Sequence, residues 1–103
     1  MERVSKHIHY LELLAKPASQ EQASGLVATA SEDQLNCVSE LTLNLLSGRI
    51  DLTRHYKSLL AKEADVIRRL GDRELGPRKR KSVAQDNVET VVKILAICLK
   101  RIG

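Results

Sequence analysis

Apolar residues recur at intervals of three and four along almost the whole chain, and no other feature constrains the fold as strongly. Val4, Ile8, Leu11 and Leu14 begin the series, and residues 88–102 end it with a broad apolar stripe. Such intervals place side chains on one face of an α-helix, whereas a half-buried strand alternates with a period of two. No segment of the sequence shows that alternation. The sequence therefore predicts an all-α protein.

Capping signals divide the series into about five short helices. Pro17 ends the first helix, and the capping-box sequences Ser19–Gln22 and Ser31–Gln34 open the second and the third. Gly48 and Gly71 supply the C-terminal ends of the third and fourth helices. Short connections between such helices favour antiparallel neighbours, so we expect a compact bundle.

Weaker signals complete this outline. The fourth helix is expected to begin with a cap at Asp51 or Thr53, and the fifth begins between Pro77 and Asp86. Between these two helices the chain is expected to form a basic loop at about residues 72–82.

The composition requires an aliphatic core. The chain has 103 residues with no Phe, no Trp and two Tyr, and its length fits one domain, residues 1–103. A domain of this size buries one core and leaves no room for a large internal cavity. Folds that stack single-stranded bases on aromatic rings are disfavoured. Cys37 and Cys98 lie in apolar helical stretches, so both are expected to be buried free thiols.

Charge divides the chain into two halves. Residues 1–53 carry four Lys and Arg against seven Asp and Glu, whereas residues 54–103 carry thirteen against six. The first half is thus formally −3 and the second +7, which gives the net charge of +4. A basic half on a small helical protein favours an anionic partner, such as nucleic acid or an acidic protein surface.

The densest basic run is Arg78–Lys81, directly after Gly76 and Pro77. Four adjacent cations repel one another and are expected to stay in solvent. Phosphate contact, a nuclear localisation signal and an ordinary solvated surface all remain open for this run. With the cations of the fourth helix it predicts a surface for nucleic-acid backbone, made of Arg54, Lys57, Arg68, Arg69, Arg73, Arg78, Lys79, Arg80 and Lys81.

The last helix carries more apolar residues than one helix face needs. Its stripe is too wide and too aliphatic for a surface helix, which favours the bundle core or an oligomer interface. A helix lying on a membrane is the weaker alternative, because interfacial aromatic residues are missing. The residues expected at an oligomer or partner interface are Val91, Ile94, Leu95, Cys98 and Ile102.

No catalytic or metal-binding constellation can be read from the sequence. His7 and His9 are two residues apart and therefore on different helix faces, while a metal pair on a helix needs a spacing of three or four. Gly71 and Gly76 lack the preceding strand and the following Lys-Ser/Thr of a phosphate-binding loop. We therefore predict no enzyme, no metal site and no cofactor.

The central stretch Ser39–Leu52 carries a Glu, an Asn-Leu-Leu, a Gly, an Ile and a Leu ahead of a basic helix. In this order it resembles small basic proteins of the Maverick/Polinton elements and the related adintoviruses. The likeness extends more loosely to Leu11–Ala15 and Ser31–Leu35 upstream, and to Arg68–Asp72 and Arg78–Lys81 downstream. The resemblance implies an accessory product of a double-stranded DNA virus or virus-like element, acting as a minor virion or core component.

The sequence thus predicts a non-enzymatic protein whose basic face, residues 54–81, binds nucleic-acid backbone without reading base sequence. Two alternatives stay open: a helical adaptor that binds a capsid or host protein, and a membrane-active minor capsid protein. The sequence shows neither a signal peptide nor an apolar run long enough to cross a bilayer. An intracellular location is therefore expected, in the nucleus or within a virion.

Overall fold

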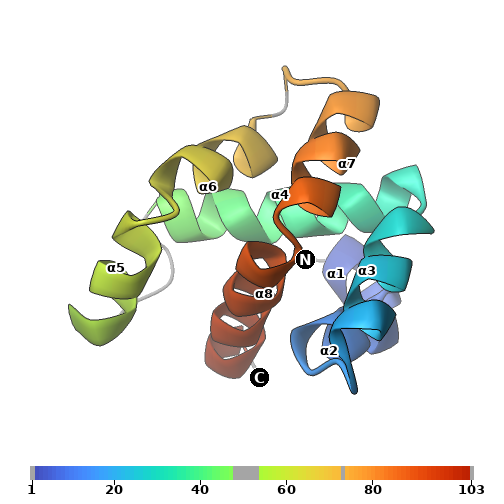
Figure 1. Cartoon of the computed structure of the whole chain (residues 1–103), viewed down its shortest axis with the longest axis horizontal. Helices are drawn as coiled ribbons and strands as arrows, with labels where there is room; N and C mark the ends of the chain where they lie inside the picture. The colour runs from blue at the N-terminus through green and yellow to red at the C-terminus, as the bar shows by residue number, and fades with distance from the viewer. Residues whose placement is uncertain (1, 48–53, 73, 103) are drawn as a thin grey trace.

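The computed structural model describes residues 2–47, 54–72 and 74–102, and all regular structure in these ranges is helical (Figure 1). The all-α class predicted from the apolar spacing is therefore confirmed. The helices are more numerous than the predicted number of about five, because three of the expected helices are each divided in two. They are α1 (Glu2–Lys6), α2 (Ile8–Ala15), α3 (Gln20–Ala28), α4 (Glu32–Leu46), α5 (Arg54–Ala61), α6 (Ala64–Gly71), α7 (Pro77–Asp86) and α8 (Val88–Ile102).

Each of these divisions occurs at a polar residue. His7 separates α1 from α2, Glu63 directly precedes α6, and Asn87 separates α7 from α8. Their φ and ψ angles are −110° and 22° for His7, −108° and 16° for Glu63, and −136° and 46° for Asn87. These backbone angles lie outside the range of a regular α-helix, so each residue changes the direction of the chain.

All three divisions use the same pattern of backbone hydrogen bonds. The N–H of the dividing residue donates to the carbonyl three residues earlier, at 3.2, 2.9 and 3.2 Å in chain order. The carbonyl of the same residue accepts from the N–H four residues later, at 3.0, 3.0 and 3.1 Å, so the next helix starts at once. None of the three residues is Gly or Pro, which are the usual signals of a helix end. The apolar spacing therefore continues through the divisions without marking them.

At Asn87 the side chain explains the break. Its Nδ2 donates to the Val83 carbonyl at 2.9 Å, which is the acceptor that the Asn87 N–H would use in a continuous helix. A side chain that competes for a helix carbonyl in this way bends or ends the helix. In Figure 1, α7 consequently occupies the upper part of the molecule and α8 the lower part.

Two of the predicted helix starts are confirmed. At α4, Ser31 Oγ accepts from the Gln34 N–H at 3.1 Å, and Gln34 Oε1 accepts from the Ser31 N–H at 2.9 Å, which completes a capping box. At α3, Ser19 Oγ accepts from the Gln22 N–H at 3.0 Å. Residues 48–53, with the expected Gly48 end and the expected Asp51 or Thr53 start, lie outside the described ranges.

The central helix of the fold is α4. It packs against α6, α7 and α8, while α8 also packs along α2. In Figure 1, α4 runs across the molecule with α6 and α7 above it, α8 below it and α1–α3 at one end. Leu41, Leu70 and Ile94, from α4, α6 and α8, are fully buried. Gly71 lets α6 approach α4 closely, because a Cβ at this position would lie 3.1 Å from Leu46 Cδ1.

The basic loop expected at residues 72–82 is shorter than predicted. Helix α7 begins at Pro77, so residues 77–82 are helical. Pro suits the first position of a helix, because its φ is already helical and it has no N–H that needs an acceptor.

Arg80, on α7, is buried with its guanidinium against α4. Its Nε donates to the Leu75 carbonyl at 3.0 Å, Nη1 to Ser39 Oγ at 2.6 Å and Nη2 to Asn36 Oδ1 at 3.0 Å. Arg80 is 6% exposed, and no described carboxylate forms an ion pair with it. The prediction that the whole run Arg78–Lys81 stays in solvent is therefore wrong at Arg80, because three protein acceptors replace its water.

We expect Arg80→Lys to lower the free energy of unfolding by about 2 kcal/mol. The substitution keeps the charge, but one ammonium group cannot reach all three acceptors, so at least one buried oxygen loses its donor. Urea unfolding followed by circular dichroism measures the change. Arg78→Lys, at an exposed neighbour, is the matched control and should change the free energy by less than about 0.5 kcal/mol. Equal effects in the two variants would show that the Arg80 hydrogen bonds do not anchor α7.

Cys37 and Cys98 are buried free thiols, as predicted. Cys98 Sγ donates to the Leu41 carbonyl at 3.7 Å, which links α8 to α4. Burial raises the pKa of the Cys98 thiol from its ordinary 9.0 to about 12, because the charged thiolate is disfavoured away from water.

This raised pKa predicts a loss of stability in alkali. In the unfolded chain the Cys98 thiol ionises above pH 9.0, whereas in the folded chain it stays neutral up to about pH 12. Below pH 9.0 the thiol is neutral in both states, so its contribution to the free energy of unfolding is fully present. As the pH rises toward 12, only the unfolded chain releases the proton, so this contribution is lost. Over this window the free energy of unfolding should fall relative to Cys98→Ala by up to about 1.4 kcal/mol per pH unit. Urea unfolding at a series of pH values tests this, and parallel pH profiles of the two proteins would contradict it.

Candidate nucleic-acid interface

Six of the nine residues predicted to contact nucleic acid are exposed on three successive helices. They are Arg54 and Lys57 on α5, Arg68 and Arg69 on α6, and Arg78 and Lys79 on α7. Arg73 lies outside the described residues, so its predicted role stays a prediction. The remaining two, Arg80 and Lys81, face the protein.

The cations of α6 and α7 lie near the two ends of one short connection. Arg68 and Arg69 lie in the last turn of α6, Arg78 and Lys79 lie in the first turn of α7, and residues 72–76 connect the two turns. The two helices also pack against each other, and in Figure 1 helix α7 begins near the upper margin. We call these four residues the basic edge. Helix α5 precedes α6 and extends away from α7 (Figure 1).

Carboxylates partly offset the charge of the basic edge. Asp65 Oδ2 accepts from Arg69 Nη2 at 2.7 Å, and the two side chains are 83% and 49% exposed. An ion pair this exposed contributes little stability and opens readily to a competing anion. Asp72 and Glu74 are exposed in the connection between the helices, where Asp72 Oδ1 accepts from the Glu74 N–H at 3.0 Å.

Arg80 determines the direction in which its neighbours point. Successive residues of an α-helix are about 100° apart around its axis, so Arg78 lies nearly opposite the buried Arg80. Lys81 is half-buried, and its Nζ donates to the Ala30 carbonyl at 3.1 Å, which ties α7 to the connection between α3 and α4. The prediction that Arg80 contacts phosphate is corrected, because its guanidinium is buried against α4, while the predicted contact at the half-buried Lys81 stays a prediction.

The start of α7 has a concentrated positive charge. Its N-cap, Gly76, provides no side-chain cap, and no acidic residue lies in its first turn. The partial positive charge of a helix N-terminus therefore adds to the charges of Arg78 and Lys79. An anion at this end of the helix would be stabilised by both.

The interface predicted on α8 is part of the core. Val91, Ile94, Leu95 and Cys98 are all fully buried, with at most 1% exposure, because this face of α8 packs on α2 and α4. The side chain of Ile102 is not among those described. The four buried residues are therefore unavailable to a partner of the folded chain, and the prediction is corrected. The outer face of α8 is a different set of residues.

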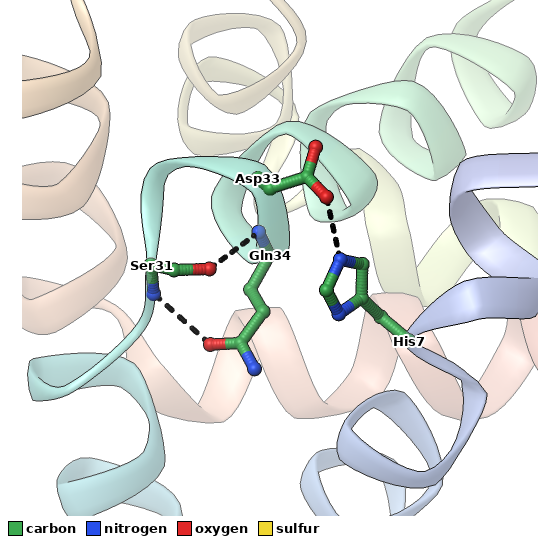
Figure 2. A network of polar contacts seen from close by, with 4 residues as sticks. All are labelled: His7, Ser31, Asp33 and Gln34. Atoms are coloured by element: carbon green, nitrogen blue, oxygen red, sulfur yellow. Dashed lines mark hydrogen bonds and ion pairs between the residues drawn. The ribbon is translucent and has the colours of Figure 1, made fainter.

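A polar network missed by the sequence analysis joins the N-terminal helices to α4 (Figure 2). His7 Nε2 and Asp33 Oδ2 are 2.6 Å apart, beside the capping box of Ser31 and Gln34. His7 is also the residue that divides α1 from α2, so one residue changes the chain direction and holds α4. The contact joins residues 26 positions apart, and no local pattern in the sequence indicates it.

Metal clusters and membrane spans are both absent from the described part of the chain. No group of three or more His, Cys, Asp and Glu side chains there is arranged to hold a metal ion. No helix within residues 2–47, 54–72 and 74–102 has the length and apolarity needed to cross a bilayer.

No family model matches the chain, and comparisons with curated proteins and with solved structures give no match either. The resemblance to Maverick/Polinton and adintovirus proteins therefore stays a prediction.

We expect His7→Ala to lower the free energy of unfolding by about 1–2 kcal/mol, because it removes the side-chain contact between His7 and Asp33. Thermal unfolding followed by circular dichroism at constant pH measures the loss. His9→Ala, at an exposed position on α2, is the matched control and should change the free energy by less than about 0.5 kcal/mol. If His9→Ala cost as much as His7→Ala, the network would not hold the N-terminal helices.

Proposed function

We propose that this chain is a non-enzymatic protein that binds nucleic-acid backbone through the exposed cations of α5, α6 and α7. The observation that carries the proposal is the set of exposed cations on three successive helices, of which Arg69 alone has an ion pair among the described residues. Phosphates supply the repeated negative charge that such a spread of cations needs. Binding would release counterions from the nucleic acid and would therefore depend steeply on salt.

The buried guanidinium of Arg80 supports the proposal in an indirect way. Arg80 ties α7 to α4, and Lys81 ties it to the connection between α3 and α4, so Arg78 and Lys79 stand on an anchored helix start at the basic edge. Cations on a fixed element lose less conformational freedom on binding than cations on a loop. Arg78 and Lys79 on helix α7 are therefore better suited to phosphate contact than they would be in the predicted loop over residues 72–82.

The chain has only two aromatic residues, which fits recognition of nucleic acid by charge and not by stacking on bases. Tyr10 is half-buried, and its hydroxyl donates to the Leu26 carbonyl at 2.7 Å, so its ring serves the fold. The other aromatic residue, Tyr56, has no described side chain. Contacts to phosphates position a protein on nucleic acid without reading its sequence. On this proposal the chain is an accessory component that neutralises backbone charge, as the resemblance to minor virion or core proteins implies.

We expect binding to a labelled random-sequence DNA duplex that weakens steeply with salt. Six phosphate contacts would lower the affinity by about 10³-fold between about 50 and 200 mM salt. In the double variant Arg78→Glu, Lys79→Glu, the slope of log affinity against log salt should become shallower by about two units, since two contacts are lost. Fluorescence anisotropy titrations at several salt concentrations measure both quantities. Arg80 is left intact in this variant, and a circular dichroism spectrum equal to that of the unmodified chain would exclude unfolding of α7 as the cause of a loss of binding.

The matched control is Lys6→Glu, Lys16→Glu, which makes the same change in net charge on the exposed surface of α1 and at the end of α2. Its salt slope should stay that of the unmodified chain. If both double variants weaken binding equally, the basic edge is not the contact surface. Absence of binding at about 50 mM salt would reject nucleic acid as the partner.

A further inference from the structure

A separate feature, distinct from the basic edge, runs along the outer face of α8. A hollow of about 810 Å³ opens between α2 and the C-terminal half of α8, and Ala15, Ala96 and Leu99 are among its lining residues. A hollow of about 330 Å³ lies along the N-terminal half of α8, with Val88 and Val92 in its lining. We call the two hollows together the α8 groove.

The two hollows lie end to end. Lys93 lines both of them, and the lining residues of α8 extend from Val88 to Lys100. At 1.5 Å per residue this face of α8 is about 18 Å long, or a little over three helical turns. A shallow apolar groove of that length between helices matches the footprint of an amphipathic helix.

The lining of the groove suits close packing of helices. Val88, Val92, Ala96 and Leu99 follow one another at intervals of four, four and three, the spacing of a single helix face. Ala96 and, across the groove, Ala15 on α2 have small side chains, which leave room for a partner backbone to approach. Val88, Val92 and Leu99 pack in part against the core and stay partly exposed, and Ala96 is exposed, so this face of α8 offers apolar surface to a partner.

The rim of the groove is mainly basic. Lys16, directly after α2, and Lys93 and Lys100 of α8 line the larger hollow together with the carboxylate of Glu12. Glu89 lies at the smaller hollow. No described carboxylate forms an ion pair with any of the three lysines. Lys93 and Lys100 are seven residues apart, which is two helical turns, so both stand on one side of the groove.

We propose that the α8 groove binds an amphipathic helix of a partner protein, with an apolar stripe and carboxylates repeated at seven-residue spacing. The apolar stripe packs on Val92, Ala96 and Leu99, and the carboxylates pair with Lys93 and Lys100, as flanking charges do in two-helix packing. The interaction goes beyond backbone binding, because it uses another surface, an apolar contact and a partner of a different class.

A second copy of the chain fits the groove less well. The large apolar side chains that are exposed among the described residues are Leu13 and Leu46, on two different helices, so they form no stripe. Packing α8 of one copy on α8 of another would bring their Lys93 and Lys100 side chains together, and like charges at such positions repel. Charge and apolar spacing both favour an acidic helix of a partner protein over a second copy of the chain.

Two fluorescein-labelled peptides of about 18 residues test the proposal. Both carry the same leucine and alanine stripe at helical spacing, and one has Glu where the other has Lys at the flanking positions with seven-residue spacing. Fluorescence anisotropy with the full chain should show at least about tenfold tighter binding of the acidic peptide. With Lys93→Glu, Lys100→Glu, the preference should reverse toward the basic peptide.

Two further variants show whether the peptide binds in the groove or elsewhere on the chain. Ala96→Gln adds a neutral, longer side chain at an exposed helical position, so the fold is kept while the groove is filled, and both peptides should lose about tenfold or more in affinity. Arg78→Glu, Lys79→Glu, at the basic edge, should leave peptide binding unchanged. The two proposals can therefore fail independently.

The proposal would be overturned by absence of acidic-peptide binding up to about 100 µM. Equal binding of both peptides, unchanged in the Lys93 and Lys100 double variant, would also reject it. A concentration-dependent dimer in analytical ultracentrifugation that is lost in Ala96→Gln would instead assign the groove to a second copy. Co-sedimentation with vesicles of anionic lipid that is lost in the same variant would assign it to a membrane surface.

Discussion

The position of α7 depends on a buried guanidinium that is balanced by neutral groups. Arg80 donates to Asn36 and Ser39 on α4 and to the Leu75 carbonyl just before α7. A guanidinium keeps its charge in a protein, so its burial is tolerated because fixed acceptors replace the water it loses. The planar group has donors in several directions, which lets it hold a helix and the connection before it at once. The first turn of α7, with its exposed cations, therefore has a fixed orientation relative to α4.

The core is built from small and aliphatic side chains. Without Phe or Trp, the core is filled by Leu, Ile, Val, Ala and Cys, which reach only a short distance from each helix axis. Helices must therefore approach closely, as α6 does on α4 at Gly71, and a long straight helix would soon leave so small a body, whose extents are 33 × 28 × 27 Å. The changes of direction at His7, Glu63 and Asn87 keep the apolar stripes of the flanking helices on one core.

How far the sequence predicts this structure depends on the range of each interaction. Helix class, the capping box at Ser31 and the buried thiols follow from local patterns and are predictable. The divisions between helices carry no Gly or Pro and could not be located. Arg80 lies in a basic run that is typical of solvent, and only its acceptors on α4, more than 40 positions away, distinguish it from Arg78. The apolar residues of α8 were recognisable as a group, but the choice of the buried face depends on where α2 and α4 lie.

The division at Asn87 connects the two proposed surfaces. It separates a helix whose first turn is basic from a helix whose outer face is an apolar groove, and it sends them to different parts of the molecule (Figure 1). Nucleic acid on the basic edge and an acidic helix in the α8 groove would therefore not compete for space. Their dependence on salt should also differ, because the first interaction rests on charge alone and the second on apolar contact with charged flanks. A small chain built in this way could link a nucleic acid to a protein that carries negative charge.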